Sequence, residues 1–192
     1  MSETKTLTKT KWNIDKAHSE VGFAVKHLMI TNVKGTFKDY DASIYTTDED
    51  FTTAEVDFWL DPASVDTGDA NRDNHIRSND FFDTENFKQI HFTTDFAVDK
   101  VDDDGSYELW GDLTIRGIKK QVKLSIEFGG VVKDPWGNHK AGISIHTKIN
   151  RKDWGLNWNV ALETGGVLVG DAVTINLEVE VVKQAEAQAV AA

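Results

Sequence analysis

The sequence predicts an all-β protein of about eight antiparallel strands, and three observations support this fold class. Apolar residues recur at every second position through most of the 192 residues, which is the period of a strand with one buried face. Short turn-like segments, such as residues 102–105 and 134–138, separate these runs. No long helical pattern lies between them. Eight such strands can close into a barrel or stack as a sandwich, and the periodicity alone does not choose between the two.

The first half of the chain contains four expected strand regions, each with its apolar residues on one face. These residues are Val21, Phe23 and Val25, then Phe37, Tyr40, Ala42 and Ile44, then Ala54, Val56, Phe58 and Leu60, and finally Ile90, Phe92, Phe96 and Val98. Between Phe37 and Tyr40 the inward position changes parity, because an odd number of positions separates the two residues. Such a switch predicts a bulge or a bend in the strand.

The second half is more regular and contains four further strand regions. Their apolar residues are Tyr107, Leu109, Leu113 and Ile115, then Val122, Leu124, Ile126 and Phe128, then Ala141, Ile143, Ile145 and Ile149, and finally Val173, Ile175, Leu177, Val179 and Val181. A turn at residues 116–120 joins the first two of these regions. Large apolar side chains therefore lie on one face of every expected strand.

Residues 61–89 interrupt this rhythm for longer than a simple turn, so we expect a structured insert there. Asp69 is placed to cap a short helix that follows it. Phe81 and Phe82 are the apolar anchors that we expect to hold the insert against the strands. Two interpretations of these rings stay open. They form a structural plug over one end, which we favour, or they line the deep end or the mouth of a cavity.

Composition and charge exclude several classes of function. The formal charge of −11 argues against a nucleic-acid partner and disfavours simple electrostatic docking on an anionic membrane. The chain has no cysteine, which excludes disulfides, zinc–thiolate sites and thiol nucleophiles. Residues 1–11 contain no apolar leader, and no segment reaches the roughly 18 apolar residues of a membrane span, so we expect no stable membrane insertion. The expected location is cytoplasmic, or periplasmic if a leader has been removed.

The segment from residue 72 to 83 concentrates charged, imidazole and aromatic side chains, and Arg72, Asp73 and His75 lie within four positions of one another. An enzyme acting on a lipid or a small apolar substrate would use these three as acid–base groups. No nucleophile motif accompanies them, and on a helix Arg72 and His75 share a face that Asp73 does not share. We therefore favour a structural role, with contact to a polar headgroup as the second option.

The six histidines show none of the spacings of a metal site, so we predict no metal and no cofactor. Asp15, His18 and Ser19 supply the three residue types of a catalytic triad. Their short separation on an extended chain predicts a turn instead of a relay.

Residues 150–158 form a second polar and aromatic cluster, directly after an expected strand. Arg151 and Asp153 supply the charge of this cluster. Trp154 and Trp158 either shield a rim of the fold or pack on it, and we favour packing.

Six segments of the chain, taken together, point to a known family. They are "WNIDKAHSEVGFAVKHL", "GTFKDYDASI", "SVDTGDANRDNHIRSNDFFD", "GDLTIRGIKKQVKL", "GISIHTKINRKDWGL" and "VGDAVTINLEVE". In order and spacing they resemble the YceI-like family of lipocalin-like polyisoprenoid-binding proteins. The resemblance covers about residues 12–182, which is nearly the whole expected domain.

The resemblance implies an extended antiparallel eight-stranded lipocalin-like barrel with a short helical insert. It also implies that the interior holds a long apolar chain, such as an isoprenoid or quinone tail, and that the protein is a homodimer. Many members of the family are periplasmic. The chain departs from the family's pattern in two places, since it shows no leader and carries Lys88 where a proline is usual. The segment 72–83 is then the insert that helps close the barrel, with no bond-breaking role.

The function expected on this basis is non-catalytic binding, storage or transport of a long amphiphilic lipid. The barrel is expected to span residues 12–182, between flexible tails at 1–11 and 183–192. An isoprenoid quinone or polyprenyl lipid that copurifies with the protein is the expected ligand. The alternatives are the enzyme described above and a fully packed protein without a cavity. The residues expected to line the apolar tunnel are Phe23, Val25, Phe37, Phe58, Phe82, Phe92, Leu113, Ile115, Leu124, Ile126, Ile143, Ile145, Val173, Ile175 and Leu177. The residues expected at its polar mouth are Arg72, His75, Arg151 and Trp154.

Overall fold

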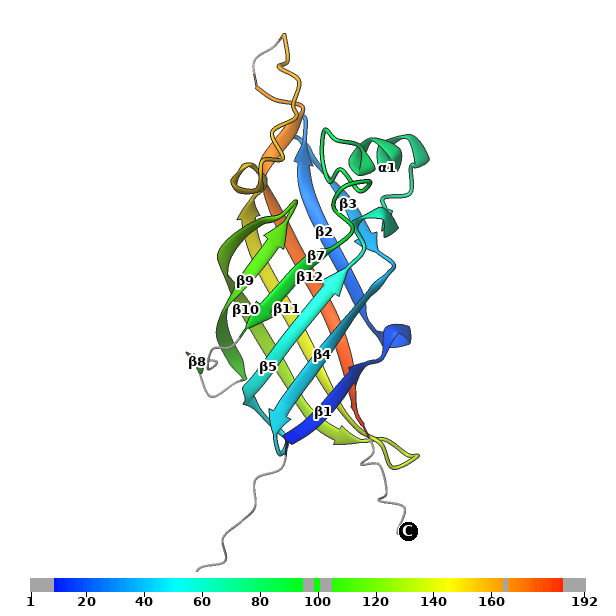
Figure 1. The fold of residues 1–192 in the computed structure, drawn as a ribbon, viewed down its shortest axis with the longest axis vertical. Helices are drawn as coiled ribbons and strands as arrows, with labels where there is room; N and C mark the ends of the chain where they lie inside the picture. Colours follow the sequence, from blue (N-terminus) through cyan, green and yellow to red (C-terminus); the bar gives the residue numbers. More distant parts are fainter. Residues whose placement is uncertain (1–8, 95–98, 101–104, 164–165, 185–192) are drawn as a thin grey trace, which may run out of the picture.

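The computed structural model describes residues 9–94, 99–100, 105–163 and 166–184 and shows an elongated barrel of tilted strands with one short α-helix (Figure 1). The strands are β1 (Lys9–Ile14), β2 (Glu20–His27), β3 (Thr31–Phe37), β4 (Tyr40–Thr47), β5 (Asp50–Leu60), β6 (Val65–Asp66), β7 (Ile90–Thr94), β8 (Asp99–Lys100), β9 (Ser106–Ile115), β10 (Ile118–Lys133), β11 (His139–Asn150) and β12 (Val169–Lys183). The helical segments are α1 (Ala70–Arg77) and the 3₁₀ turns η1 (Lys16–His18), η2 (Pro62–Ser64) and η3 (Arg151–Trp154).

The sheet closes on itself through β12. The first part of β12 pairs with β2, where Val173 lies opposite Val25, and its end pairs with β1, where Trp12 lies opposite Lys183. The other edge of β12 pairs with β11. Because β2 also pairs with β3 and β1 with β4, β1 and β2 share one strand position and β3 and β4 share the next. The barrel therefore has eight antiparallel positions, which confirms the predicted fold class.

The bend predicted between Phe37 and Tyr40 is confirmed, because β3 ends at Phe37 and β4 begins at Tyr40. The side chain of Ser64 holds this break. Its Oγ accepts hydrogen bonds from the backbone N–H groups of Lys38 and Asp39 at 3.1 and 3.0 Å. The break lets one strand position change direction while both of its halves keep their apolar residues inside.

The predicted turn after Ile115 is a tight two-residue hairpin between β9 and β10. Ile115 pairs with Ile118, and the two residues between them, Arg116 and Gly117, have φ angles of 49° and 73°. Two consecutive positive φ values are typical of the turn whose twist matches that of antiparallel strands. This turn sets the register of the ten residue pairs between β9 and β10.

A cluster of buried residues lies at the lower end of the barrel, where β1 begins and β12 ends in Figure 1. Trp12 is completely buried there, and its indole Nε1 donates a hydrogen bond to Thr46 Oγ1 at 2.9 Å. Val181 is also fully buried, and Ala141 and Ile44 complete this cluster. The burial of one large aromatic residue with its polar atom satisfied makes this end a stable base for the barrel.

The insert lies at the upper end and contains the predicted helix, α1 (Figure 1). Asp69 is its N-cap, as predicted, and accepts hydrogen bonds from the backbone N–H groups of Asn71 and Arg72, both at 3.0 Å. The two-residue strand β6 attaches the beginning of the insert to β3. Arg77 fixes the end of α1, because its guanidinium donates to the carbonyl oxygens of Ala63 and Val65, both at 2.7 Å.

The boundaries of the domain differ slightly from the prediction. Strand β1 begins at Lys9, within the predicted tail of residues 1–11, because Lys9 to Lys11 pair with β4. Strand β12 extends to Lys183. The other predicted tail residues, 1–8 and 185–192, lie outside the described residues, and so do the predicted strand residues Phe96 and Val98.

Within the described part of the chain, no helix has the length and apolar character that crossing a bilayer requires. The α-helix, α1, has only eight residues.

We expect Trp12→Ala to lower the free energy of unfolding by about 3 to 5 kcal/mol, because it leaves a cavity and removes the partner of Thr46. The matched control is Trp136→Ala, because Trp136 is 84% exposed. For the control we expect a change within about 0.5 kcal/mol. Urea unfolding followed by far-ultraviolet circular dichroism measures both variants. Equal destabilisation by the two substitutions would contradict the packing described for the lower end.

Candidate functional site

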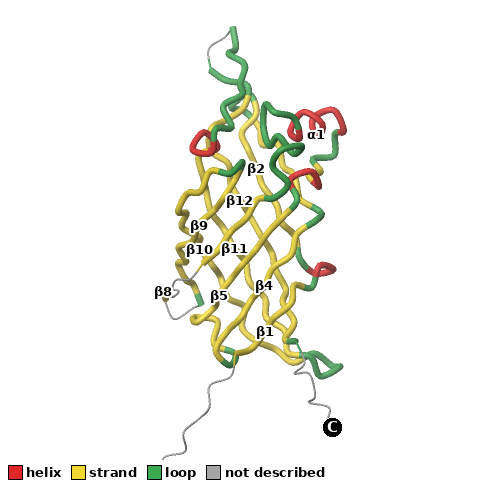
Figure 2. The backbone as a smooth tube through the Cα atoms, in the orientation of Figure 1, coloured by secondary structure: helices red, strands yellow, loops and turns green. Residues whose placement is uncertain are grey.

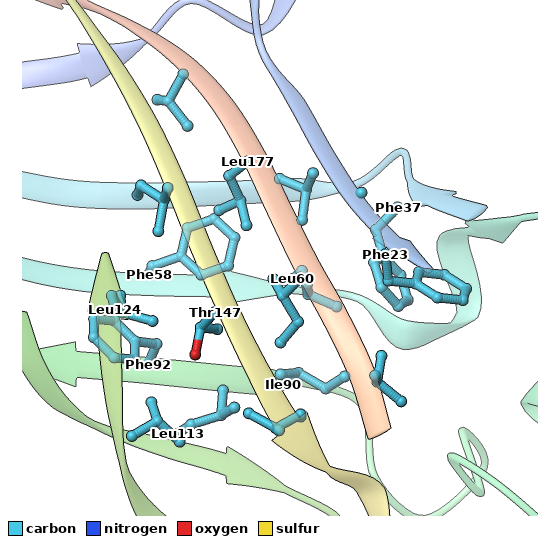
Figure 3. A pocket seen from close by; sticks show the side chains of 18 of the residues that line it. Phe23, Phe37, Phe58, Leu60, Ile90, Phe92, Leu113, Leu124, Thr147 and Leu177 are labelled. Carbon is cyan, nitrogen blue, oxygen red and sulfur yellow. The ribbon is translucent and has the colours of Figure 1, made fainter. Parts of the chain in front are cut away.

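An apolar cavity of about 290 Å³ runs along the inside of the barrel. Its walls come from every strand position and from the insert, and Figure 3 shows Phe58, Leu124 and Leu177 pointing into it from different strands. Its lining reaches from Phe128 and Val179 near the lower end to Val169 near the upper end. So small a volume spread along so much of the barrel describes a long, narrow channel.

The fifteen residues predicted to form the apolar tunnel all line this cavity. Most lining residues outside that prediction lie at inward positions of the same strands. The further lining residues are Ile14, Val21, Gly22, Ala42, Ile44, Phe51, Ala54, Val56, Leu60, Ile76, Phe81, Ile90, Tyr107, Leu109, Val122, Phe128, Thr147, Ile149, Leu156, Val169 and Val179. Strand alternation was a sufficient signal for most of them, whereas Ile76 and Leu156 lie outside the strands.

Aromatic rings close the lower end of the cavity. The ring centroids of Phe51 and Phe128 are 4.9 Å apart, and Phe51 also lies 4.8 Å from the buried Trp12. Tyr107 contacts Phe128 at 6.5 Å. These rings fill the space below the channel, so the channel does not continue through the lower end.

The two phenylalanines of the insert reach the upper end of the cavity. Phe82 packs edge-on against Phe37 with ring centroids 5.9 Å apart. Phe37 packs against Phe23 at 5.6 Å, and Figure 3 shows these two residues as neighbours. Phe81 and Phe82 both line the cavity. The insert therefore plugs the barrel and lines the channel at the same time, so both interpretations of these rings hold.

A second aromatic contact joins the insert to the connection between η3 and β12. The ring of Trp158 lies 4.5 Å from that of His75 and 5.4 Å from that of Phe81, measured between centroids. His75 Nε2 is 2.9 Å from Asp80 Oδ2. We call His75, Phe81 and Trp158 the upper aromatic cluster. It connects two segments that are far apart in the sequence across the upper end of the barrel.

Arg151 is the one charged residue among the described cavity-lining residues, and it is only 3% exposed. Its guanidinium donates to the backbone carbonyl oxygens of Gly170, Leu156 and Val169. Asp171 Oδ1 lies 3.6 Å from Nη2. Burial lowers the pKa of Arg151, and the charge of Asp171 raises it. Because carbonyls occupy its donors, Arg151 fastens the connection before β12 to the barrel wall.

Comparison with known proteins agrees with this architecture. A profile of the YceI-like domain matches residues 12–181, almost the whole barrel. The chain belongs to the YceI family. The UPF0312 protein of Staphylococcus epidermidis is 40% identical to it over 172 residues, which cover 89% of this chain and 96% of that protein.

Solved structures place this YceI-family barrel among its relatives. The Campylobacter jejuni YCEI protein is 36% identical, with a TM-score of 0.69, and the match covers 97% of this chain and 100% of that one. A polyisoprenoid binding domain from Saccharophagus degradans is 13% identical, with a TM-score of 0.61 and coverage of 90% and 98%. The second likeness is one of fold alone.

Three residues predicted at the polar mouth of the YceI-family barrel do not line its cavity. Arg72 donates from Nε to Thr67 Oγ1 at 2.7 Å and from Nη2 to Thr67 O at 2.8 Å, so it fixes the loop before α1. His75 belongs to the upper aromatic cluster, above Phe81. Trp154 is 2% exposed and donates from Nε1 to Leu113 O at 3.2 Å, which makes it a packing residue. Other contacts within the fold hold the polar atoms of these three residues, so none of them lines the cavity, and their contact with a headgroup stays a prediction.

Arg72, Asp73 and His75 do not converge on a common point. Asp73 is buried and accepts hydrogen bonds from Thr67 N at 3.0 Å and from Thr67 Oγ1 at 2.6 Å. Arg72 contacts the same threonine, whereas His75 contacts Asp80. Arg72 and Asp73 thus organise the entry into α1.

The predicted turn at Asp15 and His18 is confirmed, and it forms an ionic cluster on the barrel wall. Asp15 caps η1 and lies 3.0 Å from His18 Nδ1. Lys140 Nζ lies 3.3 Å from Asp15 Oδ2 and 2.7 Å from Glu180 Oε1. The pKa of Asp15 is lowered to about 2, chiefly by the hydrogen bond with His18 and also by Ala17 N–H and Lys140, while burial opposes this shift. The Lys140 ammonium thus pairs with the carboxylates of both Asp15 and Glu180.

Asp15→Asn keeps the cap acceptor and removes the charge. Because the pKa of Asp15 is about 2 when folded and near 3.8 otherwise, its stabilisation is present above pH 4 and is lost as the pH falls through 2. We expect the variant to be less stable than the wild type by about 1 to 2 kcal/mol at about pH 5, and this difference to vanish near pH 2. Urea titrations at both pH values measure it. A difference that does not depend on pH would show that the carboxylate charge has no such role.

Proposed function

We propose that this protein binds, stores or carries a long amphiphilic lipid of the polyisoprenoid or isoprenoid-quinone class, without converting it chemically. The observation that carries the proposal is the long, narrow cavity, whose described lining contains only three side chains with a nitrogen or oxygen atom, Tyr107, Thr147 and Arg151. Thr147 Oγ1 already donates to Lys123 O at 2.7 Å, and Arg151 is bound to backbone carbonyls. Such a channel favours hydrocarbon along its whole length.

The energetics support a chain-shaped ligand. Burial of each methylene contributes about 0.8 kcal/mol, so a chain of about twenty carbons gains at most about 16 kcal/mol before association and ordering costs are subtracted. Apolar contact of this kind does not distinguish one tail from another. Selection among lipids must therefore come from the length of the channel and from the few polar groups near its upper end.

The distribution of polar groups supports a position of the headgroup outside the channel. Arg151 is charged, but carbonyl oxygens take up its donors. An unpartnered carbonyl or phosphate deep in the barrel would lose its hydrogen bonds to water without replacement, which is costly. A lipid with its polar group at one end, near the upper aromatic cluster, avoids this cost. The polyisoprenoid binding domain of Saccharophagus degradans, which has this fold, supports the same class of ligand.

A non-catalytic role agrees with the arrangement of the candidate acid–base groups. An enzyme needs a titrating group within hydrogen-bond reach of its substrate. Arg72 and Asp73 are directed to Thr67, and His75 is directed to Asp80. The homodimer and the cytoplasmic location expected from the sequence stay predictions, and light scattering and cell fractionation measure them.

Native mass spectrometry of the purified protein tests the proposal directly. We expect an added mass that organic extraction identifies as a polyprenyl chain or an isoprenoid quinone. The extracted protein should then take up a prenyl alcohol in a binding titration. A protein that carries no added mass and also refuses prenyl alcohols and quinones would exclude the carrier function.

Leu177→Trp tests whether the cavity is the binding site. Leu177 lines the middle of the channel on β12, and an indole there occupies much of its small volume. We expect prenyl alcohol binding to weaken by about tenfold or more, which corresponds to about 1.4 kcal/mol. Ala172→Trp is the matched control, because Ala172 is an exposed residue of the same strand. Thermal melting of both variants shows that they fold, and equal binding by the two would place the lipid elsewhere.

A further inference from the structure

An exposed apolar ridge lies at the turn between β2 and β3. Leu28, Met29 and Ile30 are 36%, 55% and 80% exposed. The φ angles of Leu28 and Met29 are 50° and 62°, a backbone region that favours glycine and asparagine at such a turn. Neither the backbone conformation nor the interior of the barrel therefore accounts for three large apolar residues here. Exposed apolar residues gathered in this way mark an interaction surface.

The ridge continues onto the connection that precedes β12. The backbone N–H of Leu28 donates to Leu168 O at 2.9 Å, and the N–H of Leu168 donates to Val160 O at 3.0 Å. Val160 is 46% exposed. Figure 2 shows these loops together at the upper end of the barrel. We call Leu28, Met29, Ile30 and Val160 the apolar tip.

The apolar tip adjoins the upper end of the cavity. Leu168 precedes Val169, which lines the cavity and pairs with His27 at the base of the turn. Gly170, next in the chain, is the carbonyl partner of Arg151. The exposed ridge and the rim of the channel are thus joined by the hydrogen bond from Leu28 N–H to Leu168 O, one residue before Val169.

The charged residues of the β2–β3 hairpin between Val21 and Lys38 are all basic, whereas the chain as a whole is acidic. The chain carries 32 acidic residues, yet none occurs between Val21 and Lys38. Lys26 and Lys34 are exposed, and within the described residues neither has an ion-pair partner. Glu163, on the connection, is an exposed acid nearby. At physiological salt charges beyond about 8 Å are screened, so these lysines determine the local attraction more than the net charge of −11 does.

We propose that the apolar tip docks transiently on an anionic lipid bilayer, with Lys26 and Lys34 near the headgroups and Met29 and Ile30 in the interface. The proposal rests on the lipid-carrier function above, because a lipid that is insoluble in water must enter and leave the channel from a membrane. Docking at this tip turns the upper end of the channel toward the membrane. A bilayer fits the surface because apolar side chains flanked by basic residues are the pattern of shallow interfacial anchors.

Vesicle flotation of the full chain tests this docking surface. Phosphatidylcholine vesicles are compared with vesicles in which about a third of the lipid is phosphatidylglycerol. We expect the wild type to float with the anionic vesicles and to be released by high salt. Met29→Ser/Ile30→Ser and, separately, Lys26→Glu/Lys34→Glu should each reduce the bound fraction by about tenfold.

A matched control uses the exposed apolar residues at the opposite end of the barrel. Val132 and Trp136 are 61% and 84% exposed. Val132→Ser/Trp136→Ser should bind anionic vesicles as the wild type does. Equal loss in the tip and control variants would overturn the proposal, and so would a wild type that floats with neither kind of vesicle. A wild type that dimerises in light scattering, does not float, and becomes monomeric in the tip variant would assign the surface to a second copy of the chain and overturn the proposal as well.

The Leu177→Trp variant separates this proposal from the carrier function. We expect it to lose prenyl alcohol binding and to keep vesicle docking, whereas the tip variants should keep binding of a short prenyl alcohol in solution. Docking without any lipid uptake by the wild type would leave the tip assigned and refute the carrier function. Lipid uptake by the wild type without vesicle docking would support the carrier function and refute the docking proposal.

Discussion

Closure of the sheet through β12 is the constraint on which the rest of this structure depends. One edge of β12 pairs with β11, and its other edge pairs with both β1 and β2, so the barrel has no free edge at this position. Successive side chains of a strand point to opposite faces, and closure therefore sends one parity of every strand to a common interior. The apolar channel is a direct consequence of this geometry, and the charged side chains of the described strands do not line it.

The interior keeps a channel because its two ends are closed by different means. Rings from β1, β5 and β10 fill the lower end, with Trp12, Phe51 and Phe128 in contact. The upper end is covered by segments that are not part of the barrel wall, the insert and the connection before β12, which meet at His75 and Trp158. An opening between loops needs less rearrangement than an opening between paired strands, so the upper end is the natural entrance.

Buried and half-buried polar groups hold these covering segments in place. Arg151 holds the connection by its carbonyls, and Arg72 and Asp73 hold the start of α1 through Thr67. A buried charge is tolerated when hydrogen bonds satisfy it, and each of these has such partners. These charged residues therefore support the segments at the upper end of the cavity. The apolar tip beside them faces outward, where the proposed contact with a membrane would form.

The sequence by itself determined the strands, the inward face of each one, the bend after Phe37 and the cap at Asp69. These features depend on local periodicity and on hydrogen bonds between neighbouring residues, which a single chain displays directly. Only the tertiary structure decided which polar atoms meet. Trp154 and Arg151 donate hydrogen bonds to the backbone carbonyls of Leu113 and Gly170, and the ring of His75 packs against that of Trp158. Such partners are distant along the chain and come together only when the barrel closes, so no spacing in the sequence records them.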